Sequence, residues 1–209
     1  MSNLIKDNSL VLLQGDSVTD CGRSRTKDTE LGGGYANMIA ALFSAKYPEK
    51  NVRFINRGVS GNRVKDLQTR WKEDCLDLEP DWVSILIGIN DCWRKYDSND
   101  PTSVEAYEKG YRDILKRTVN ETDARLILCE PFVLPVPEDR KKWREDLDPK
   151  IQAVRLLAIE FNAIYVPFDG IFAAASVKRE PAFWAADGVH PTSAGHALMA
   201  IEWLKAVSA

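Results

Sequence analysis

The stretch "VLLQGDSVTD", residues 11–20, indicates how the chain folds and where its chemistry lies. Its first residues are apolar, which is typical of a strand buried on both faces of a sheet. Gly15, Asp16 and Ser17 then end the apolar run abruptly. These are common turn residues, but the end of a buried strand is also where an α/β protein places reactive groups. Ser17 is therefore either a turn residue or a nucleophile.

Four further apolar runs of strand length follow along the chain. They are "VRFIN" from residue 52, "WVSILIG" from 82, "ARLILCE" from 124 and "AIYVPF" from 163. Helical patterns lie between or after them, over residues 64–75, 104–114, 147–161 and 193–207. Strands that alternate with helices favour right-handed crossovers and a parallel sheet. The sequence thus predicts one α/β domain, residues 1–209: a three-layer α/β/α sandwich around a five-stranded parallel sheet.

The composition narrows the function classes. The 209 residues include 28 basic and 31 acidic side chains, a net charge of −3. This balance provides no broad positive field for a phosphate backbone, so we expect no nucleic-acid partner. No stretch approaches the roughly 20 apolar residues of a membrane helix, and the first ten residues lack a signal-peptide pattern. We therefore expect a soluble, cytoplasmic protein without a membrane partner, and homo-oligomers are compatible with the sequence.

The cysteine spacing supports the same compartment. The four cysteines are Cys21, Cys75, Cys92 and Cys129. They are widely spaced and contain no C-x-x-C pair, which favours reduced, buried thiols over a disulfide framework or a zinc site.

Polar residues gather where the predicted strands end. They are Gly15, Asp16 and Ser17 after the first strand, Gly58, Ser60, Gly61 and Asn62 after the second, Gly88, Asn90 and Asp91 after the third, and Asp187 and His190 near the end of the chain. The carboxyl ends of parallel strands meet at one edge of a sheet, where ligands bind. Serine, histidine, aspartate and an amide are together the ingredients of acyl transfer.

The two histidines differ in their surroundings. A serine hydroxyl needs a base to take its proton, and histidine has a suitable pKa. His190 follows Asp187 by three residues in one predicted loop, so the carboxylate can fix the imidazole tautomer,. His196 falls inside the last helical pattern, where we expect a packed or capping side chain.

Three groups are candidates to stabilise the oxyanion of a tetrahedral intermediate. They are the backbone N–H groups of Ser17 and Gly61 and the side-chain amide of Asn90. Glycine at position 61 would let the backbone approach a substrate, although a plain turn explains it almost as well. Asp16 either anchors this loop or forms an Asx-turn.

These residues together resemble the SGNH hydrolases, the GDSL family. The four blocks, in the family's order, are "GDS" at 15–17, Gly61 in "NRGVSGN", "GIND" at 88–91 and "DGVH" at 187–190. Longer stretches such as "GDSVTDCGRSR" and "DGVHPTSAGH" are similar to the branch of bacterial acetylxylan esterases and carbohydrate deacetylases. The resemblance implies a flavodoxin-like fold, and a serine mechanism would need no cofactor or metal. It implies the roles of nucleophile (Ser17), base (His190), orienter (Asp187) and oxyanion partners (Gly61, Asn90).

Three further side chains are candidate substrate contacts. Trp93 and Trp184 lie near the "GIND" and "DGVH" blocks and could stack on sugar rings, but tryptophans more often pack in a core,. Arg63 flanks the same region and could equally be solvated or ion-paired.

The sequence therefore predicts a serine esterase that removes short acyl groups, above all acetyl, from carbohydrate hydroxyls such as those of xylo-oligosaccharides. The alternative is a lysophospholipase or thioesterase acting on longer acyl chains. The charged segment "LPVPEDRKKWRED", residues 134–146, which we predict to be a loop after the fourth strand, disfavours a long apolar groove,.

Other classes explain fewer of these residues. A magnesium-dependent phosphohydrolase could use Asp16, Asp20, Asp91 and Asp187, but would leave His190 unexplained. A dinucleotide-binding domain would need G-x-G-x-x-G after the first strand, which is missing,. A binding module without catalysis would not need the serine, histidine and aspartate.

Overall fold

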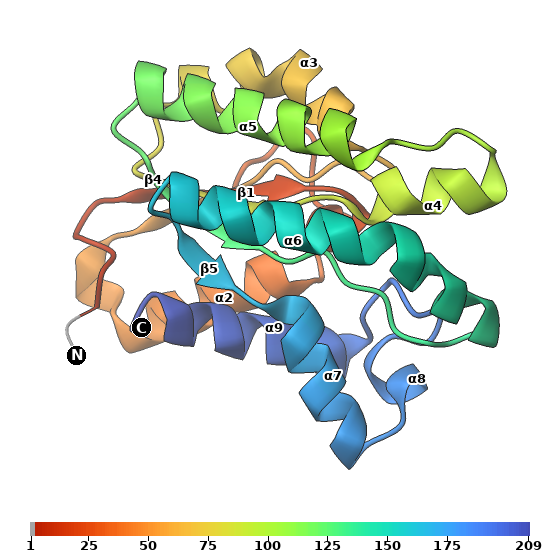
Figure 1. Cartoon of the computed structure of the whole chain (residues 1–209). Helices are drawn as coiled ribbons and strands as arrows, with labels where there is room; N and C mark the ends of the chain where they lie inside the picture. Colours follow the sequence, from red (N-terminus) through yellow and green to blue (C-terminus); the bar gives the residue numbers. More distant parts are fainter. Residues whose placement is uncertain (1–2) are drawn as a thin grey trace.

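Five parallel strands form the centre of the fold in the computed structural model, which describes residues 3–209 (Figure 1). The strands are β1 (Leu10–Gly15), β2 (Arg53–Asn56), β3 (Trp82–Leu86), β4 (Arg125–Cys129) and β5 (Ile164–Val166). They lie in the order β2-β1-β3-β4-β5, and every neighbouring pair is parallel. All five predicted strands and the predicted α/β class are confirmed.

Helices cover both faces of this sheet. The α-helices are α1 (Ser17–Asp20), α2 (Tyr35–Lys46), α3 (Val64–Asp74), α4 (Ile89–Asp97), α5 (Val104–Glu121), α6 (Arg144–Glu160), α7 (Phe168–Lys178), α8 (Pro181–Trp184) and α9 (Ser193–Ala206). Short 3₁₀ helices are η1 (Pro48–Lys50), η2 (Leu76–Leu78) and η3 (Glu138–Trp143). Helices α3, α5 and α6 pack on one face, and α2, α7 and α9 on the other. The four predicted helical patterns correspond to α3, α5, α6 and α9.

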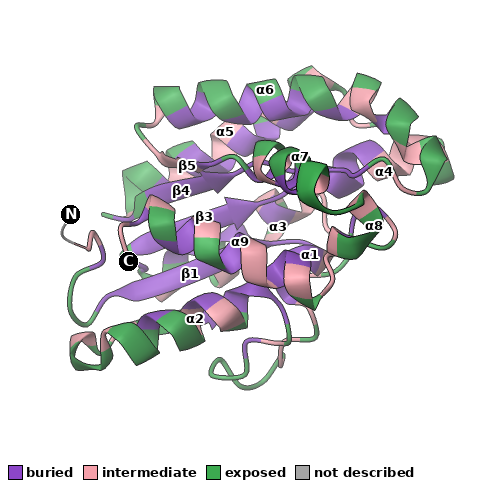
Figure 2. Ribbon diagram, turned by 90° about the horizontal axis from the view of Figure 1, so that it is seen from below, coloured by how far each residue is buried: buried purple, intermediate pink, exposed green. Residues whose placement is uncertain are grey.

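The strand β1 shows why its sequence is apolar throughout. Side chains alternate between the two faces of a strand. Val11 and Leu13 therefore enter the core cluster beneath α2 and α9, whereas Leu10 and Leu12 enter the cluster beneath α3 and α5. Because both faces are covered, every residue of β1 is buried, and the strands form the buried centre of Figure 2.

The strand order creates a switch point at β1. The chain passes from β1 to β2 on one side and later returns to β3 on the other side of β1. Loops that leave two such strands diverge and leave a crevice at their carboxyl ends, which is the usual ligand site of an open α/β sheet. Ser17 follows the last residue of β1 by two positions, so it lies at this crevice.

The prediction of a loop over residues 134–146 is wrong in its second half. Residues Glu138–Trp143 form η3, and α6 begins at Arg144. In a 3₁₀ helix, positions three apart share one side. The side chains of Arg140 and Trp143 are accordingly largely buried, with the guanidinium carbon 4.0 Å from the indole centroid. The charged neighbours, such as Lys141 and Lys142, remain exposed.

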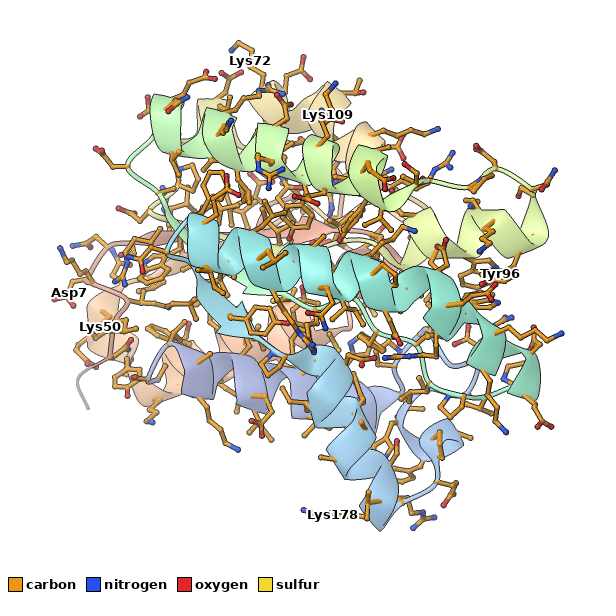
Figure 3. The ribbon with its side chains drawn as sticks, in the orientation of Figure 1. Asp7, Lys50, Lys72, Tyr96, Lys109 and Lys178 are labelled. Atoms are coloured by element: carbon orange, nitrogen blue, oxygen red, sulfur yellow. The ribbon has the colours of Figure 1, made fainter. Side chains whose placement is uncertain are left out.

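Charged side chains project from the outer surfaces of the helices. Figure 3 shows Lys72, Lys109 and Lys178 at the periphery, and all three are exposed. Among residues 3–209, no helix is both long enough and apolar enough to cross a membrane.

Candidate active site

Ser17 lies in a tight turn between β1 and α1. A side chain at Gly15 would collide with the carbonyl of Leu86 and with the side chain of Thr19, so only glycine fits,. Asp16 caps α1, because its Oδ1 accepts the N–H of Val18 at 3.0 Å,. The chain therefore turns sharply and leaves Ser17, the first residue of α1, partly exposed at the carboxyl edge of the sheet.

Ser17, His190 and Asp187 form one hydrogen-bonded chain. The Ser17 Oγ lies 2.9 Å from Nε2 of His190, and the His190 Nδ1 lies 2.7 Å from Oδ2 of Asp187. The other carboxylate oxygen, Oδ1, accepts the backbone N–H groups of Val189 and His190 at 2.9 and 2.7 Å. Burial alone would raise the pKa of Asp187, but these hydrogen bonds from His190 and Val189 outweigh it and lower that pKa,. The carboxylate is therefore ionised beside the imidazole.

Gly188 fixes the loop that carries Asp187 and His190. Its φ is +81°, a region that favours glycine, and a side chain there would collide with the carbonyls of Leu134 and Val136,. The N–H of Leu134 donates to the Gly188 carbonyl at 2.8 Å. The segment after β4 thus presses directly on the loop that carries the histidine.

The loop that contains Gly61 is anchored by a buried carboxylate that the sequence did not single out for this role. Asp20 Oδ2 accepts both the N–H and the hydroxyl of Ser60 at 2.9 Å and pairs with Arg25 at 2.5 Å. Burial would raise the pKa of Asp20, but the hydrogen bonds from Ser60 and Arg25 lower it. Asn56, at the end of β2, donates to the carbonyl of Thr19 at 2.6 Å and binds the same turn to the sheet.

Asn90 is tied to the same loop from the other side. Its amide donates to the carbonyl of Asn62 at 3.1 Å, and the N–H of Val64 donates to Asp91 Oδ2 at 3.1 Å. These two bonds hold the start of α4 against the start of α3. Burial raises the pKa of Asp91 to about 7, although the Val64 N–H opposes this.

The predicted oxyanion donors follow β1 and its two neighbouring strands. β2 and β3, the strands before Gly61 and Asn90, are both neighbours of β1. Gly61 has a φ of +82°. Within residues 3–209, the backbone N–H groups of Ser17 and Gly61 have no hydrogen-bond partner, which leaves them free to bind a ligand.

The three predicted substrate contacts differ in their surroundings. The Trp93 ring lies 5.9 Å from the His190 ring, and the guanidinium of Arg140 lies 5.2 Å from the Trp93 centroid. Trp184 donates to the carbonyl of Arg179 at 3.2 Å and packs on a neighbouring phenylalanine. The Arg63 guanidinium lies 2.6 Å from the carboxylate of Asp100, in the loop between α4 and α5. Of the three, Trp93 directly contacts the hydrogen-bonded chain, and sequence reasoning missed its partner Arg140.

His196 is buried and caps a helix, as the sequence predicts. Its Nδ1 accepts the N–H of Tyr35, the first residue of α2, at 3.1 Å. Burial, with the nearby charge of His190, lowers the pKa of His196 to about 4. It is therefore neutral and joins α9 to α2.

The four aspartates that a magnesium-dependent phosphohydrolase could use each have a different hydrogen-bond partner. Asp20 is bound to Ser60, Asp91 to Val64 and Asp187 to His190, while Asp16 accepts a backbone N–H within its own turn. Within the described part of the chain, no group of three or more histidine, cysteine, aspartate and glutamate side chains is placed to hold a metal ion.

This fold, with its switch point after the first strand, defines the class as an α/β/α sandwich of the SGNH hydrolase type. The chain belongs to the GDSL-like lipase/acylhydrolase family, whose profile matches residues 13–198, and with it to the carboxylic ester hydrolases. The family resemblance read from the sequence is confirmed.

Individual relatives are similar over almost the whole chain. The chain is 38% identical over 204 residues to an acetylxylan esterase of Geobacillus stearothermophilus, covering 94% of this chain and 93% of the relative. A crystal structure of an acetylxylan esterase from that organism matches with a TM-score of 0.90 at 35% identity, over 99% and 97% of the two chains. A protein described as a GDSL-like lipase from Parabacteroides merdae matches with a TM-score of 0.93 at 37% identity, over 99% of each chain. Catalytic mutants of the Geobacillus esterase replace a serine, an aspartate and a histidine by alanine.

Proposed function

We propose that this protein is a serine esterase that removes acetyl groups from carbohydrate hydroxyls, with acetylated xylo-oligosaccharides as the favoured substrates. The observation that carries the proposal is the hydrogen-bonded chain of Ser17, His190 and Asp187 at the switch point of the sheet. The similar acetylxylan esterase supports it, because its catalytic mutants affect the same three residue types.

In the first step, the Ser17 Oγ attacks the carbonyl carbon of the acetyl ester. His190 Nε2, 2.9 Å away, takes the hydroxyl proton as the bond to carbon forms,. The ionised Asp187 holds the tautomer of His190 and stabilises the imidazolium. The carbonyl oxygen becomes negatively charged and accepts hydrogen bonds from the N–H groups of Ser17 and Gly61 and from the Asn90 amide.

The first tetrahedral intermediate then collapses, and the bond between the carbonyl carbon and the sugar oxygen breaks. The imidazolium of His190 gives its proton to the departing sugar hydroxyl, and the acetyl group remains on Ser17. Water then attacks this acyl-enzyme while the neutral His190 takes its proton. Collapse of the second tetrahedral intermediate releases acetic acid and returns the proton to Ser17.

The surroundings of the nucleophile favour a short acyl group. The cavity behind Asp16, bordered by Ile89, Phe132 and Val189, has a volume of about 10 Å³, which is the space of roughly one water molecule. An acyl chain therefore has no room to extend beneath the turn of Ser17. Trp93, beside His190, supplies a flat apolar surface of the kind on which a sugar ring packs,.

A cytoplasmic location is part of the proposal. The cysteines Cys21, Cys75, Cys92 and Cys129 are all free. Free thiols fit a reducing compartment, in which the substrates would be small, imported, acylated carbohydrates. The proposed activity involves no nucleic acid and no membrane. It would not depend on whether the chain forms a homo-oligomer.

The test is release of acetate from acetylated xylo-oligosaccharides by the purified protein, measured beside the variant Ser17→Ala. We expect acetate from the wild type and none above background from the variant. Equal release by both proteins, or none from any acetylated carbohydrate, would contradict the proposal.

A further inference from the structure

One buried carboxyl group beneath the nucleophile has no part in the mechanism above. Asp16, directly before Ser17, is 1% exposed. Its Oδ1 accepts the N–H of Val18, but within residues 3–209 its Oδ2 has no hydrogen-bond partner. An ionised carboxylate in such a position would lose most of its solvation, which nearby backbone N–H groups replace only in part,.

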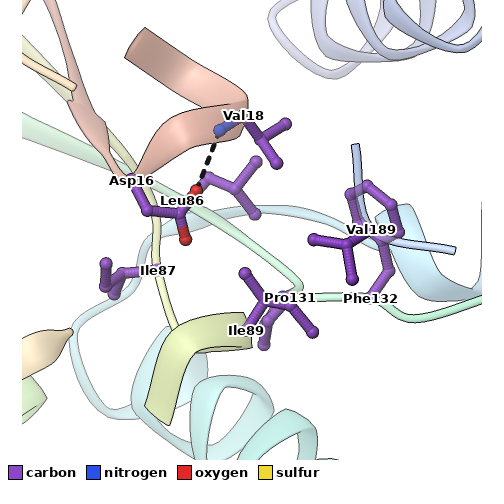
Figure 4. Close-up of a pocket in the computed structure, with 8 residues that line it drawn as sticks. All are labelled: Asp16, Val18, Leu86, Ile87, Ile89, Pro131, Phe132 and Val189. Carbon is purple, nitrogen blue, oxygen red and sulfur yellow. Dashed lines mark hydrogen bonds between the residues drawn. The ribbon is translucent and has the colours of Figure 1, made fainter. Parts of the chain in front are cut away.

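The space around this carboxyl group is apolar. Asp16 borders a cavity of about 10 Å³, whose lining residues are drawn in Figure 4. The other lining residues are Val18, Leu86, Ile87, Ile89, Pro131, Phe132 and Val189. Among the described residues no cation is ion-paired with Asp16, and the cavity is too small for a hydrated ion. Nothing in this space balances a negative charge.

The titratable groups that face Asp16 come from four neighbouring elements. They are His190 of the 187–191 loop, Asp91 of α4, Tyr35 of α2 and Tyr107 of α5. Only His190 can become positive, and the form of His190 that accepts the Ser17 proton is the neutral one. Asp91 can only add repulsion.

We propose that Asp16 acts as a neutral carboxylic acid, a positioning residue that holds the turn of Ser17 without placing a negative charge beneath the oxyanion. This inference rests on the proposed esterase mechanism. The neutral group still caps α1 through Oδ1, which accepts the Val18 N–H whether or not Oδ2 carries a proton,.

The charges of the tetrahedral intermediate explain why neutrality matters. At that point Asp187 and the oxyanion are negative and the His190 imidazolium is positive. An ionised Asp16 would add a second unbalanced negative charge next to the Ser17 N–H, one of the groups that bind the oxyanion. Inside a protein such repulsion is weakly screened.

The pKa of Asp16 also favours its neutral form. Burial raises its pKa to about 7, although the Val18 N–H and the charge of His190 lower it in part,. An acid with a raised pKa is neutral below that pKa and ionised above it. The neutral form of Asp16, which the proposal requires for activity, is therefore lost as the pH rises through this pKa.

The experiment compares the wild type with Asp16→Asn, which keeps the Oδ1 acceptor and cannot ionise. We measure kcat/KM for p-nitrophenyl acetate from pH 6 to 9. We expect the ratio of variant to wild type to rise by up to tenfold per pH unit above the pKa of Asp16, because only the wild type acquires the charge. A ratio that is constant or falls with pH would overturn the proposal.

Asp187→Asn is the matched control. It also replaces an aspartate by asparagine, but at a carboxylate that must be ionised in the proposed mechanism. We expect it to lose on the order of 10⁴ in kcat at every pH, without the rise in the ratio. Infrared difference spectroscopy between wild type and Asp16→Asn at pH 6 gives a readout independent of activity. It should show the C=O stretch of one protonated carboxylic acid in the wild type, and its absence would overturn the proposal. If the wild type hydrolyses no ester, the proposed function fails, while this band still decides the charge of Asp16.

Discussion

The Ser17 side chain is small and partly exposed, so it can be removed with little effect on packing. Ser17→Ala should fold normally but lose on the order of 10⁶ in kcat, as does removal of the serine from a comparable triad. Turnover of p-nitrophenyl acetate and intact-mass analysis after treatment with a fluorophosphonate measure this. The wild type should be labelled once, at Ser17. Labelling at another residue, or near-normal turnover by the variant, would exclude the serine mechanism.

Asn90 has both a structural and a proposed catalytic hydrogen bond. Asn90→Ala leaves the carbonyl of Asn62 unpaired, which should cost on the order of 1 kcal/mol of folding stability,. It should also lower kcat by about 10² to 10³ without a matching rise in KM, because the bond to the oxyanion exists mainly in the transition state. Activity is counted per folded molecule from the melting curve. A loss that disappears after this correction would make Asn90 purely structural.

At the residue scale, motifs in the sequence predicted the chain of Ser17, His190 and Asp187, and the structure brings these three together. The supporting residues were harder to predict. Asp20 reaches Ser60 across 40 positions of the chain, and no local pattern indicates such a contact. Asn56 gave one signal, because a polar residue that ends a buried strand must find hydrogen-bond partners.

At the scale of elements, the strands were predictable because burial on both faces makes each of them continuously apolar. The helix α2 was missed, although Tyr35, Ala36, Ile39 and Phe43 form its buried side. Its start has no capping side chain within the local sequence, since its first N–H is bound by His196 from α9. A helix that is capped from the other end of the chain lacks the usual local start signal.

This cap between α2 and α9 predicts a pH dependence of stability. The pKa of His196 is lowered to about 4 in the folded protein, against roughly 6.5 when unfolded,. Between these values the unfolded chain binds a proton that the folded chain does not. The free energy of unfolding should therefore fall as the pH is lowered from about 6.5 towards 4, by up to about 1.4 kcal/mol per pH unit from this group.

The variant His196→Asn tests this, because its side chain can still accept the Tyr35 N–H but does not titrate. Urea unfolding gives the free energy of unfolding of both proteins at pH 7 and pH 5. When the change between the two pH values is compared between wild type and variant, the contributions of other groups cancel. We expect the wild type to lose more stability than the variant between these pH values. Equal losses would show that His196 is protonated in the folded state.

At the scale of the whole molecule, the sheet order determines which loops meet. Because β1 lies between β2 and β3, the loops that carry Ser17, Gly61 and Asn90 follow three neighbouring strands. Apolar periodicity indicates the number of strands but not their order, so the prediction that these loops meet rested on the shared carboxyl edge of a parallel sheet and on the family resemblance. The segment after β4 was predicted to be a loop, because its charged sequence does not reveal which side chains turn inward. Arg140 turns inward because it lies in η3 and packs on Trp93.

The arrangement of these loops predicts the acyl specificity. With about 0.8 kcal/mol available per buried CH₂, an enzyme with an apolar groove should improve roughly fourfold per methylene until the groove is full. Here the cavity beneath the turn of Ser17 is about 10 Å³, and Trp93, with Arg140 packed on it, lies beside His190. We therefore expect kcat/KM for p-nitrophenyl esters to be highest for acetate, to fall by butyrate and to be negligible for octanoate. A maximum at hexanoate or longer would contradict the deacetylase proposal and favour a lysophospholipase or thioesterase, while leaving Ser17, Asp187 and His190 in the same roles.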